Sequence, residues 1–216
     1  VIRLSACGLK VIHKESRVTG RVDEYEPEIP MPITFNVTEF PVDCYEVVEA
    51  YVWWTISDMG SDDQLLDPKV SITGPDGRPT TIDAVQVGFD IAKAHGEMFS
   101  RGFRCNVSEA ISGNGVYHIS VNSSNHETDG ITLLIAYKHY TANPMFEGHL
   151  VVDDGLITVH GVNIIKDMYS FEICDAPRNA LGFFIASDIQ IKSNLNDYLN
   201  QFDASINNET FTFNRN

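Results

Sequence analysis

The sequence predicts an all-β protein, a β-sandwich of roughly ten to twelve short strands with one or two short helices. Three observations lead to this prediction. Short segments of alternating polarity recur along the chain, turn-forming residues separate them, and only one segment has a clear helical periodicity. The length of 216 residues suits a single domain that extends over residues 1–216.

Residues 45–56 form the strongest predicted strand. With the period of two that a strand requires, apolar side chains fall on both of its faces. One face carries Val48, Ala50, Val52 and Trp54, and the other carries mostly Tyr45, Val47, Tyr51 and Trp53. A strand with two apolar faces is covered on both sides, so we expect it at the centre of the sandwich.

Turn residues connect the other predicted strands. The Gly-Pro-Asp-Gly sequence at 74–77 predicts a hairpin between residues 70–73 and 80–82. Residues 116–121 and 131–140 are predicted to form a second hairpin with an exposed tip. Further strands are predicted at 33–37, 150–152, 156–159, 162–165, 169–174, 183–186 and 210–213.

Helical structure is predicted at few places. Residues 193–202 have apolar side chains at the spacing of an amphipathic helix. Residues 105–111 are expected to form a loop or a single helical turn capped by Ser108. Residues 89–103 are ambiguous, because a short helix can begin at Ile91 whereas the glycines at 88, 96 and 102 argue against a long one.

Both ends of the chain are candidate assembly arms. Residues 17–32 are charged and contain three prolines, which indicates a loop or an extended arm. The apolar segment 1–13 and the alternating segment 210–213 can each add a strand to the unpaired sheet edge of another copy. We therefore expect arms at residues 1–32 and 203–216.

The charge of the protein restricts its partners. With 15 Lys and Arg against 30 Asp and Glu, the net charge of -15 disfavours nucleic acid and anionic lipid. No apolar run approaches the ~20 residues that a membrane-inserted helix requires. Residues 1–8 lack the features of a signal peptide, so either the protein is not secreted or its signal peptide has been removed.

Two features favour a secreted, extracellular protein at the cell surface. Wide spacing makes the four cysteines candidates for disulfides, with four buried free thiols as the alternative. These cysteines are Cys7, Cys44, Cys105 and Cys174. Four N-x-[ST] sequences also predict a glycoprotein. The candidate glycosylation sites are Asn36, Asn106, Asn122 and Asn208.

We expect no cofactor, and four aspartates are weak candidate ligands for calcium. These are Asp58, Asp62, Asp63 and Asp67. Their spacing differs from that of an EF-hand loop, so a solvated acidic loop is the alternative, as it is for the smaller cluster of Asp153 and Asp154. Among seven histidines, His118 and His139 lie on predicted neighbouring strands and could be close enough to share a metal.

No pattern in the sequence indicates catalysis, and we expect a protein that is not an enzyme. There is no G-x-S-x-G turn, no cysteine beside a histidine and no phosphate-binding glycine loop. A carboxylate pair for glycoside hydrolysis stays open, because the chain has 30 acidic residues. Trp53 and Trp54 either belong to the core or offer a sugar-binding ring.

Six motifs in the middle of the chain occur in a particular order. They are EAYVWW at 49–54, VSITG at 70–74, CNVSEAI at 105–111, GNGVY at 113–117, GITLLIAY at 130–137 and VVDDG at 151–155. In this order, over residues 45–160, they resemble a family of uncharacterised extracellular β-sandwich domains of archaeal and bacterial surface proteins. The resemblance implies a non-catalytic, structural or adhesive role. Within that family, a small acidic chain is similar to a methanogen cell-sheath subunit.

The function we expect is therefore structural. The protein would be a subunit of a cell-envelope polymer, such as a sheath, surface layer or filament. It would be built from copies of itself through β-strand edge contacts, with disulfides between copies as an option. The alternative is an extracellular carbohydrate-binding or adhesion module.

Overall fold

The computed structural model describes residues 1–17, 31–58, 67–92, 98–122, 127–140, 147–156, 201–206 and 209–214. The chain divides into two compact units, Val1–Arg178 and Asn179–Asn216. In the second unit, β12 (Gln201–Ile206) pairs antiparallel with β13 (Glu209–Asn214). Among the described residues, no helix has the length and apolar character that crossing a membrane demands.

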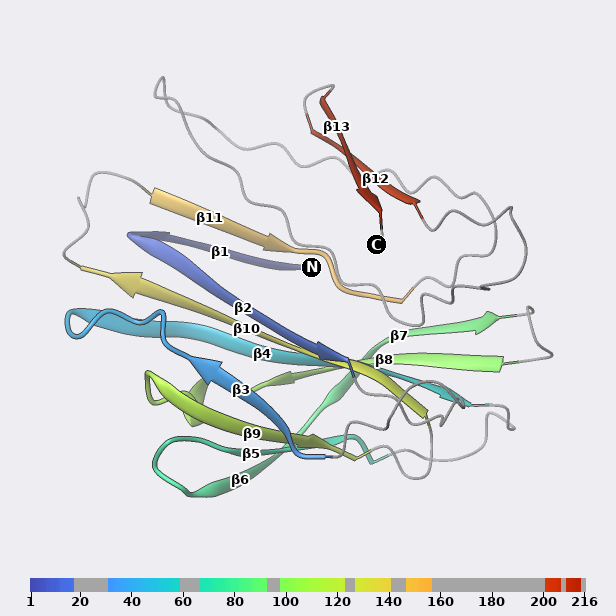
Figure 1. Cartoon of the computed structure of the whole chain (residues 1–216), viewed down its shortest axis with the longest axis horizontal. Coiled ribbons are helices and arrows are strands. Elements are labelled where there is room, and N and C mark those ends of the chain that lie inside the picture. The colour runs from blue at the N-terminus through green and yellow to red at the C-terminus, as the bar shows by residue number, and fades with distance from the viewer. Residues whose placement is uncertain are drawn as a thin grey trace. The chain divides into compact units, whose positions relative to one another are not determined.

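A sheet of five antiparallel strands forms the middle of the first unit, and we call it the large sheet (Figure 1). Its strand order is β2-β10-β4-β8-β7. The strands are β2 (Leu9–Arg17), β10 (Glu127–His139), β4 (Tyr45–Asp58), β8 (Met98–Asn106) and β7 (Val85–Ala92). As predicted, the strand that begins at Tyr45 is central and lies between two other strands.

Four shorter antiparallel strands form the small sheet, in the order β3-β9-β5-β6. They are β3 (Ile33–Val37), β9 (Gly115–Val121), β5 (Lys69–Thr73) and β6 (Pro79–Asp83). The predicted hairpin around the Gly-Pro-Asp-Gly turn is confirmed as β5 and β6. One buried apolar cluster joins the facing sides of the two sheets, so the predicted all-β, sandwich-like fold is confirmed.

A third layer covers the other face of the large sheet. β1 (Ile2–Cys7) pairs with β11 (Glu147–Val152), and Leu150 packs against a second apolar cluster that contains Tyr51 and Trp53. The Arg104 guanidinium forms an ion pair with Asp154, just after β11. It also lies 5.6 Å from the centre of the Tyr51 ring. These contacts attach the third layer to β4 and β8.

The first predicted arm is only partly within the described residues. Residues 2–7 form β1 and residues 9–17 form β2, and both strands pair with strands of the same chain. Apolar side chains of these strands, Ile2, Val11 and Ile12, reach the two clusters, which favours intrachain pairing over a free arm. Residues 18–30 lie outside the described residues. In the second predicted arm, the described residues belong to β12 and β13.

The predicted hairpin of residues 116–121 and 131–140 is wrong. β9 pairs with β3 and β5 in the small sheet, whereas β10 pairs with β2 and β4 in the large sheet. The burial patterns explain the separation. Every second residue of β9 is exposed or half-buried, whereas Ile131 to Tyr137 are buried without interruption, as a strand covered on both sides requires.

The helical predictions also need correction. The region around Ile91 forms β7 and β8, which pair as an antiparallel hairpin. A single 3-10 turn at Ser108–Ala110 agrees with the expected helical turn, but its cap position is Val107 and Ser108 lies inside it. The Ser108 hydroxyl instead accepts a hydrogen bond from the Ala50 backbone N–H at 2.8 Å. The predicted helix at 193–202 lies outside the described residues, except for its last two residues, which begin β12.

Tyr117 closes the turn that precedes β9. Its side chain is fully buried, and its hydroxyl donates to the Gly113 carbonyl at 2.7 Å. The same oxygen accepts hydrogen bonds from the backbone N–H groups of Ser112 and Gly113, both at 3.1 Å. A tyrosine that bonds back to the backbone just upstream is the tyrosine corner of Greek-key sandwiches. The Tyr117 hydroxyl therefore forms hydrogen bonds with three backbone groups.

Replacing Tyr117 with Phe should lower the free energy of unfolding by about 2–3 kcal/mol, because buried backbone groups lose their partner. Urea denaturation would measure the change. The matched control is Tyr140→Phe, since Tyr140 is 57% exposed and should change stability by less than about 0.5 kcal/mol. Equal effects of the two substitutions would contradict the role of the Tyr117 hydroxyl.

Candidate assembly surface

The described cysteines differ sharply in their surroundings. Cys7 and Cys44 are exposed, Cys105 is buried, and all three are free thiols. The Cys105 sulfur lies 3.5 Å from the Asp83 carbonyl oxygen, between the two sheets. Burial, helped by the charge of Asp83, raises the pKa of this thiol to about 11. Cys105 is therefore a core residue, and Cys174 lies outside the described residues.

The predicted glycosylation sites fall on the surface where they are described. Asn36 in β3, Asn106 at the end of β8 and Asn122 just after β9 are all exposed. The Asn106 side-chain oxygen accepts hydrogen bonds from the backbone N–H and the hydroxyl of Ser108, at 3.0 and 2.6 Å. These bonds use the amide oxygen of Asn106 and not the nitrogen that would carry a glycan. Asn208 lies outside the described residues.

The calcium candidates are only partly described. The Asp67 carboxylate accepts a hydrogen bond from the Lys69 ammonium at 2.7 Å, which occupies one of its oxygens. Asp58 is the last residue of β4, and its side chain is outside the described part of the structure, as are Asp62 and Asp63. In the described residues, no group of three or more histidine, cysteine, aspartate or glutamate side chains is placed to hold a metal.

The other polar candidates are dispersed. His118 belongs to the small sheet, and its Nδ1 lies 3.1 Å from the Thr34 hydroxyl, whereas His139 ends β10 in the large sheet. The structure therefore does not place these two histidines on neighbouring strands. Asp153 is exposed, whereas the Asp154 side chain is 7% exposed and pairs with Arg104.

The two tryptophans are core residues. Trp54 is 2% exposed and stacks on Phe103 in the cluster between the sheets, with ring centres 5.2 Å apart. Trp53 is 8% exposed and lies beneath the third layer. Neither ring presents the open face that a sugar platform needs. The core alternative from the sequence is therefore the correct one.

An apolar patch lies on β7, the last strand of the large sheet. Phe89 and Ile91 are 38% and 43% exposed on one face, whereas Val85, which pairs with Arg104, is 54% exposed on the other face. The Phe89 ring stacks on Phe99 with centres 5.9 Å apart, and the Arg101 guanidinium lies 5.2 Å from the Phe89 ring centre. We call β7 together with these exposed side chains the β7 edge.

The exposure of Phe89 and Ile91 follows from the different lengths of the two sheets. In the pairing of β7 with β8, Phe89 lies opposite Arg101 and Ile91 lies opposite Phe99. Arg101 and Phe99 precede the buried Phe103 by two and four residues, so they share its face of the strand. Phe89 and Ile91 therefore also lie on the face toward the small sheet. The end of β7 and the start of β8 extend past the strands of the small sheet (Figure 1). The small sheet therefore covers this face at Phe103 but does not reach Ile91.

The other edges of the two sheets are polar. β2 carries Lys10, Lys14 and Glu15, β3 carries Thr34 and Asn36, and β6 begins at Pro79. Charges and proline are the usual protection of an edge strand against pairing with another chain. β7 has neither a lysine nor a proline, as is also true of β3, and its single charged residue is Asp90. Besides Asp90, its protective feature is an irregularity between Gln86 and Gly88.

Sequence reasoning did not identify this surface. The alternation of Val85, Val87, Phe89 and Ile91 is typical of a strand, but a possible helix start at Ile91 left the region ambiguous. Comparison of the chain with protein families, with curated proteins and with solved structures finds no match.

Cys105 should remain unmodified in the folded protein. In a Cys174→Ser variant at about pH 8, a thiol reagent should label two sulfur atoms quickly and the third only after urea unfolds the chain. With its pKa at about 11, roughly one Cys105 thiol in a thousand is ionised at that pH. Mass spectrometry counts the labels, and rapid labelling of three thiols in the folded chain would contradict the buried position.

Proposed function

We propose that this chain is a non-catalytic structural subunit of a cell-envelope polymer, such as a sheath, surface layer or filament. Copies of the chain assemble through β-strand edge contacts. The observation that carries the proposal is the β7 edge, an edge strand that exposes Phe89 and Ile91 and lacks lysine and proline.

The physical basis is that one strand combines backbone groups open to strand pairing with exposed apolar side chains. The outer side of β7 presents backbone N–H and C=O groups that no described strand pairs with, although the Ile91 N–H already donates to the Asp90 carboxylate at 2.8 Å. A strand from another copy satisfies those groups, and its side chains cover the apolar patch. Removing apolar surface from water contributes about 25 cal/mol per Å², so both gains favour association.

The acidic surface opposes this association. Two copies, each with a net charge of -15, repel one another, and salt screens the repulsion over a Debye length of about 8 Å at physiological ionic strength. Assembly through the β7 edge should therefore strengthen as salt is added. This direction is opposite to that of an interface built on ion pairs.

The location of the polymer is inferred from the sequence features of a secreted protein. The described glycosylation candidates, Asn36, Asn106 and Asn122, are exposed, as an extracellular glycoprotein requires. The carbohydrate-binding alternative has lost its tryptophan platform, because both rings are buried. It still predicts a monomer in solution, which separates it from the proposed function.

Charge on the β7 edge should prevent assembly. Ile91→Asp should weaken association by at least about tenfold, because pairing would bury an uncompensated carboxylate at the contact. The control is Val116→Asp, which changes the same net charge at a residue of matching exposure, 42% against 43%, on the small sheet. Sedimentation velocity and negative-stain electron microscopy, both with reductant present, would compare the variants with the unmodified chain.

Two results would overturn the proposal. One is a chain that stays monomeric with reductant at every salt and protein concentration, which would favour the binding-module alternative. The other is equal loss of assembly in Ile91→Asp and Val116→Asp, which would place the contact away from the β7 edge.

A further inference from the structure

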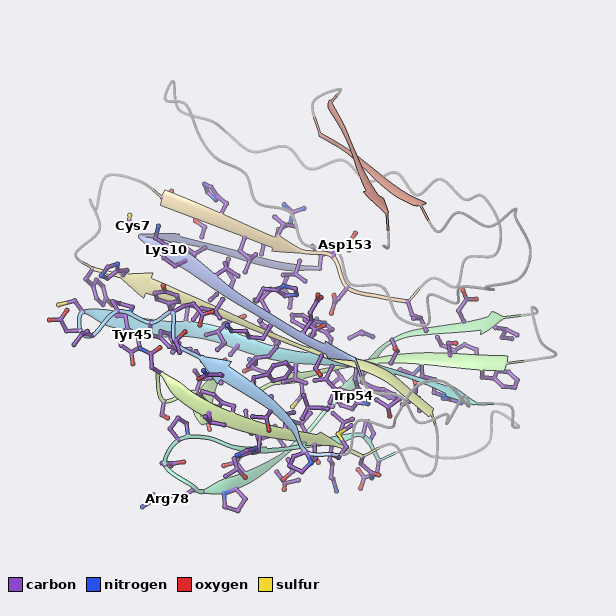
Figure 2. The ribbon with its side chains drawn as sticks, viewed as in Figure 1. Cys7, Lys10, Tyr45, Trp54, Arg78 and Asp153 are labelled. Carbon is purple, nitrogen blue, oxygen red and sulfur yellow. The ribbon has the colours of Figure 1, made fainter. Side chains whose placement is uncertain are left out.

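Two free thiols lie at one end of the sandwich, where β4 begins. Cys44 directly precedes β4, and Cys7 ends β1; both side chains are exposed. Figure 2 shows Cys7 at the same end of the first unit as Tyr45, the first residue of β4. We call Cys7, Cys44 and the exposed residues around them the cysteine end.

Gly8, which follows Cys7, and Cys44 lie on opposite sides of β10. The Gly8 carbonyl accepts a hydrogen bond from the His139 N–H at 3.0 Å, and the Cys44 carbonyl accepts one from the Tyr140 N–H at 2.8 Å. β2 and β4 flank β10 on its two sides, so the backbones beside the two cysteines are about 10 Å apart. A disulfide needs Cα atoms within about 7 Å, and Cys7 and Cys44 are both free thiols in this fold.

The surroundings of the cysteine end suit contact with another protein surface. Val42 is fully exposed two residues before Cys44, and Tyr140 is 57% exposed beside it. Apolar and aromatic side chains therefore accompany Cys44 on the surface. Cys105 differs in every respect, because it is buried between the sheets and contacts backbone carbonyls. The described thiols divide into one core residue and two surface residues.

We propose that Cys7 and Cys44 form disulfides between copies of the chain and so make the cysteine end a second, covalent contact of the polymer. This inference rests on the proposed function, in which the partner is another copy. It assigns the two exposed thiols to links between copies and Cys105 to the core.

The reaction is a thiol–disulfide exchange with a small-molecule disulfide as the oxidant. One protein thiolate attacks that disulfide, forms a mixed disulfide and releases one small thiol. A thiolate of the second copy then attacks the protein sulfur of the mixed disulfide and releases the other small thiol. The two protein thiols lose two electrons and two protons, and the small disulfide gains both.

The cysteine end lies far from the β7 edge, so a disulfide there adds a second, separate contact between copies. β4 begins beside Cys44, and its last residue, Asp58, pairs with Phe99, which in turn pairs with Ile91. The 14 residues of β4 therefore separate the two contacts by about 40 Å. Contacts at opposite ends of a subunit extend an assembly, whereas a single two-fold contact closes it as a dimer.

The test uses full-length chains in which Cys174 is replaced by Ser, so that Cys7, Cys44 and Cys105 are the only thiols. Equal amounts of isotopically labelled and unlabelled chain are reduced, mixed and treated with oxidised glutathione. Non-reducing gels should show covalent dimers and larger species. Mass spectrometry should find disulfide-linked peptides from Cys7 or Cys44 that join a labelled chain to an unlabelled one.

A second variant, which also carries Cys7→Ser and Cys44→Ser, should lose all covalent species. These substitutions are at exposed positions and should leave the folded state intact, which circular dichroism checks. The inference is overturned if the three-cysteine chain stays monomeric, if the second variant still cross-links, or if the linked peptides join Cys7 to Cys44 within one chain.

The two proposals can be tested independently of each other. Assembly through the β7 edge is measured with reductant, where no disulfide forms, and Ile91→Asp removes it. Cross-linking through the cysteine end is measured with oxidised glutathione on non-reducing gels, and Ile91→Asp should leave the covalent dimer in place. Loss of one behaviour with retention of the other identifies which contact was wrongly assigned.

Discussion

The fold depends on burying both faces of β4. Val52 and Trp54 point into the cluster between the two sheets, and Tyr51 and Trp53 point into the cluster beneath β1 and β11. Burial of a large apolar side chain contributes about 1.5–3 kcal/mol, so neither face can be left in water without a large loss. The small sheet and the third layer are both required by this one strand, and β10 and β8 fix it on either side.

Much of this arrangement could be predicted from polarity alone. The alternation of residues 45–56 correctly identified the central strand, and the turn at 74–77 correctly identified the β5–β6 hairpin. The pattern failed at the start of β4. Pairing with β10 passes from Glu49–Ala136 to Val47–Tyr137, which leaves Val48 without a partner. This bulge shifts the phase of the strand, so Tyr45 and Val47 pack against the cluster between the sheets and not beside Trp53.

Neighbouring strands in the sequence were also assigned to one hairpin when they belong to two sheets. A period of two reports which faces of a strand are buried, but it does not report which strand lies alongside. β9 and β10 follow one another in the chain, yet β9 pairs with β3 and β5 in the small sheet. The proximity of His118 and His139 expected from the sequence depended on this incorrect pairing of β9 with β10.

The candidate surface was missed for a different reason. Gly88 and Gly102 argued against a long helix, but the sequence did not show that they pair with each other in β7 and β8. A Cβ at Gly88 would lie 2.4 Å from the Leu156 nitrogen, so this glycine allows the segment after β11 to approach the sheet. Cysteine positions are plain in the sequence, whereas their exposure and separation come from the fold.

The direction of β4 also determines how the subunit would respond to mechanical force. A pull applied between the start of β4 and its far end acts along the strand, whereas the hydrogen bonds to β10 and β8 run across it. Those bonds are then loaded in shear, and the two ladders must yield together and not one bond at a time. A wall built from such units would resist stretching along this axis far better than peeling across it.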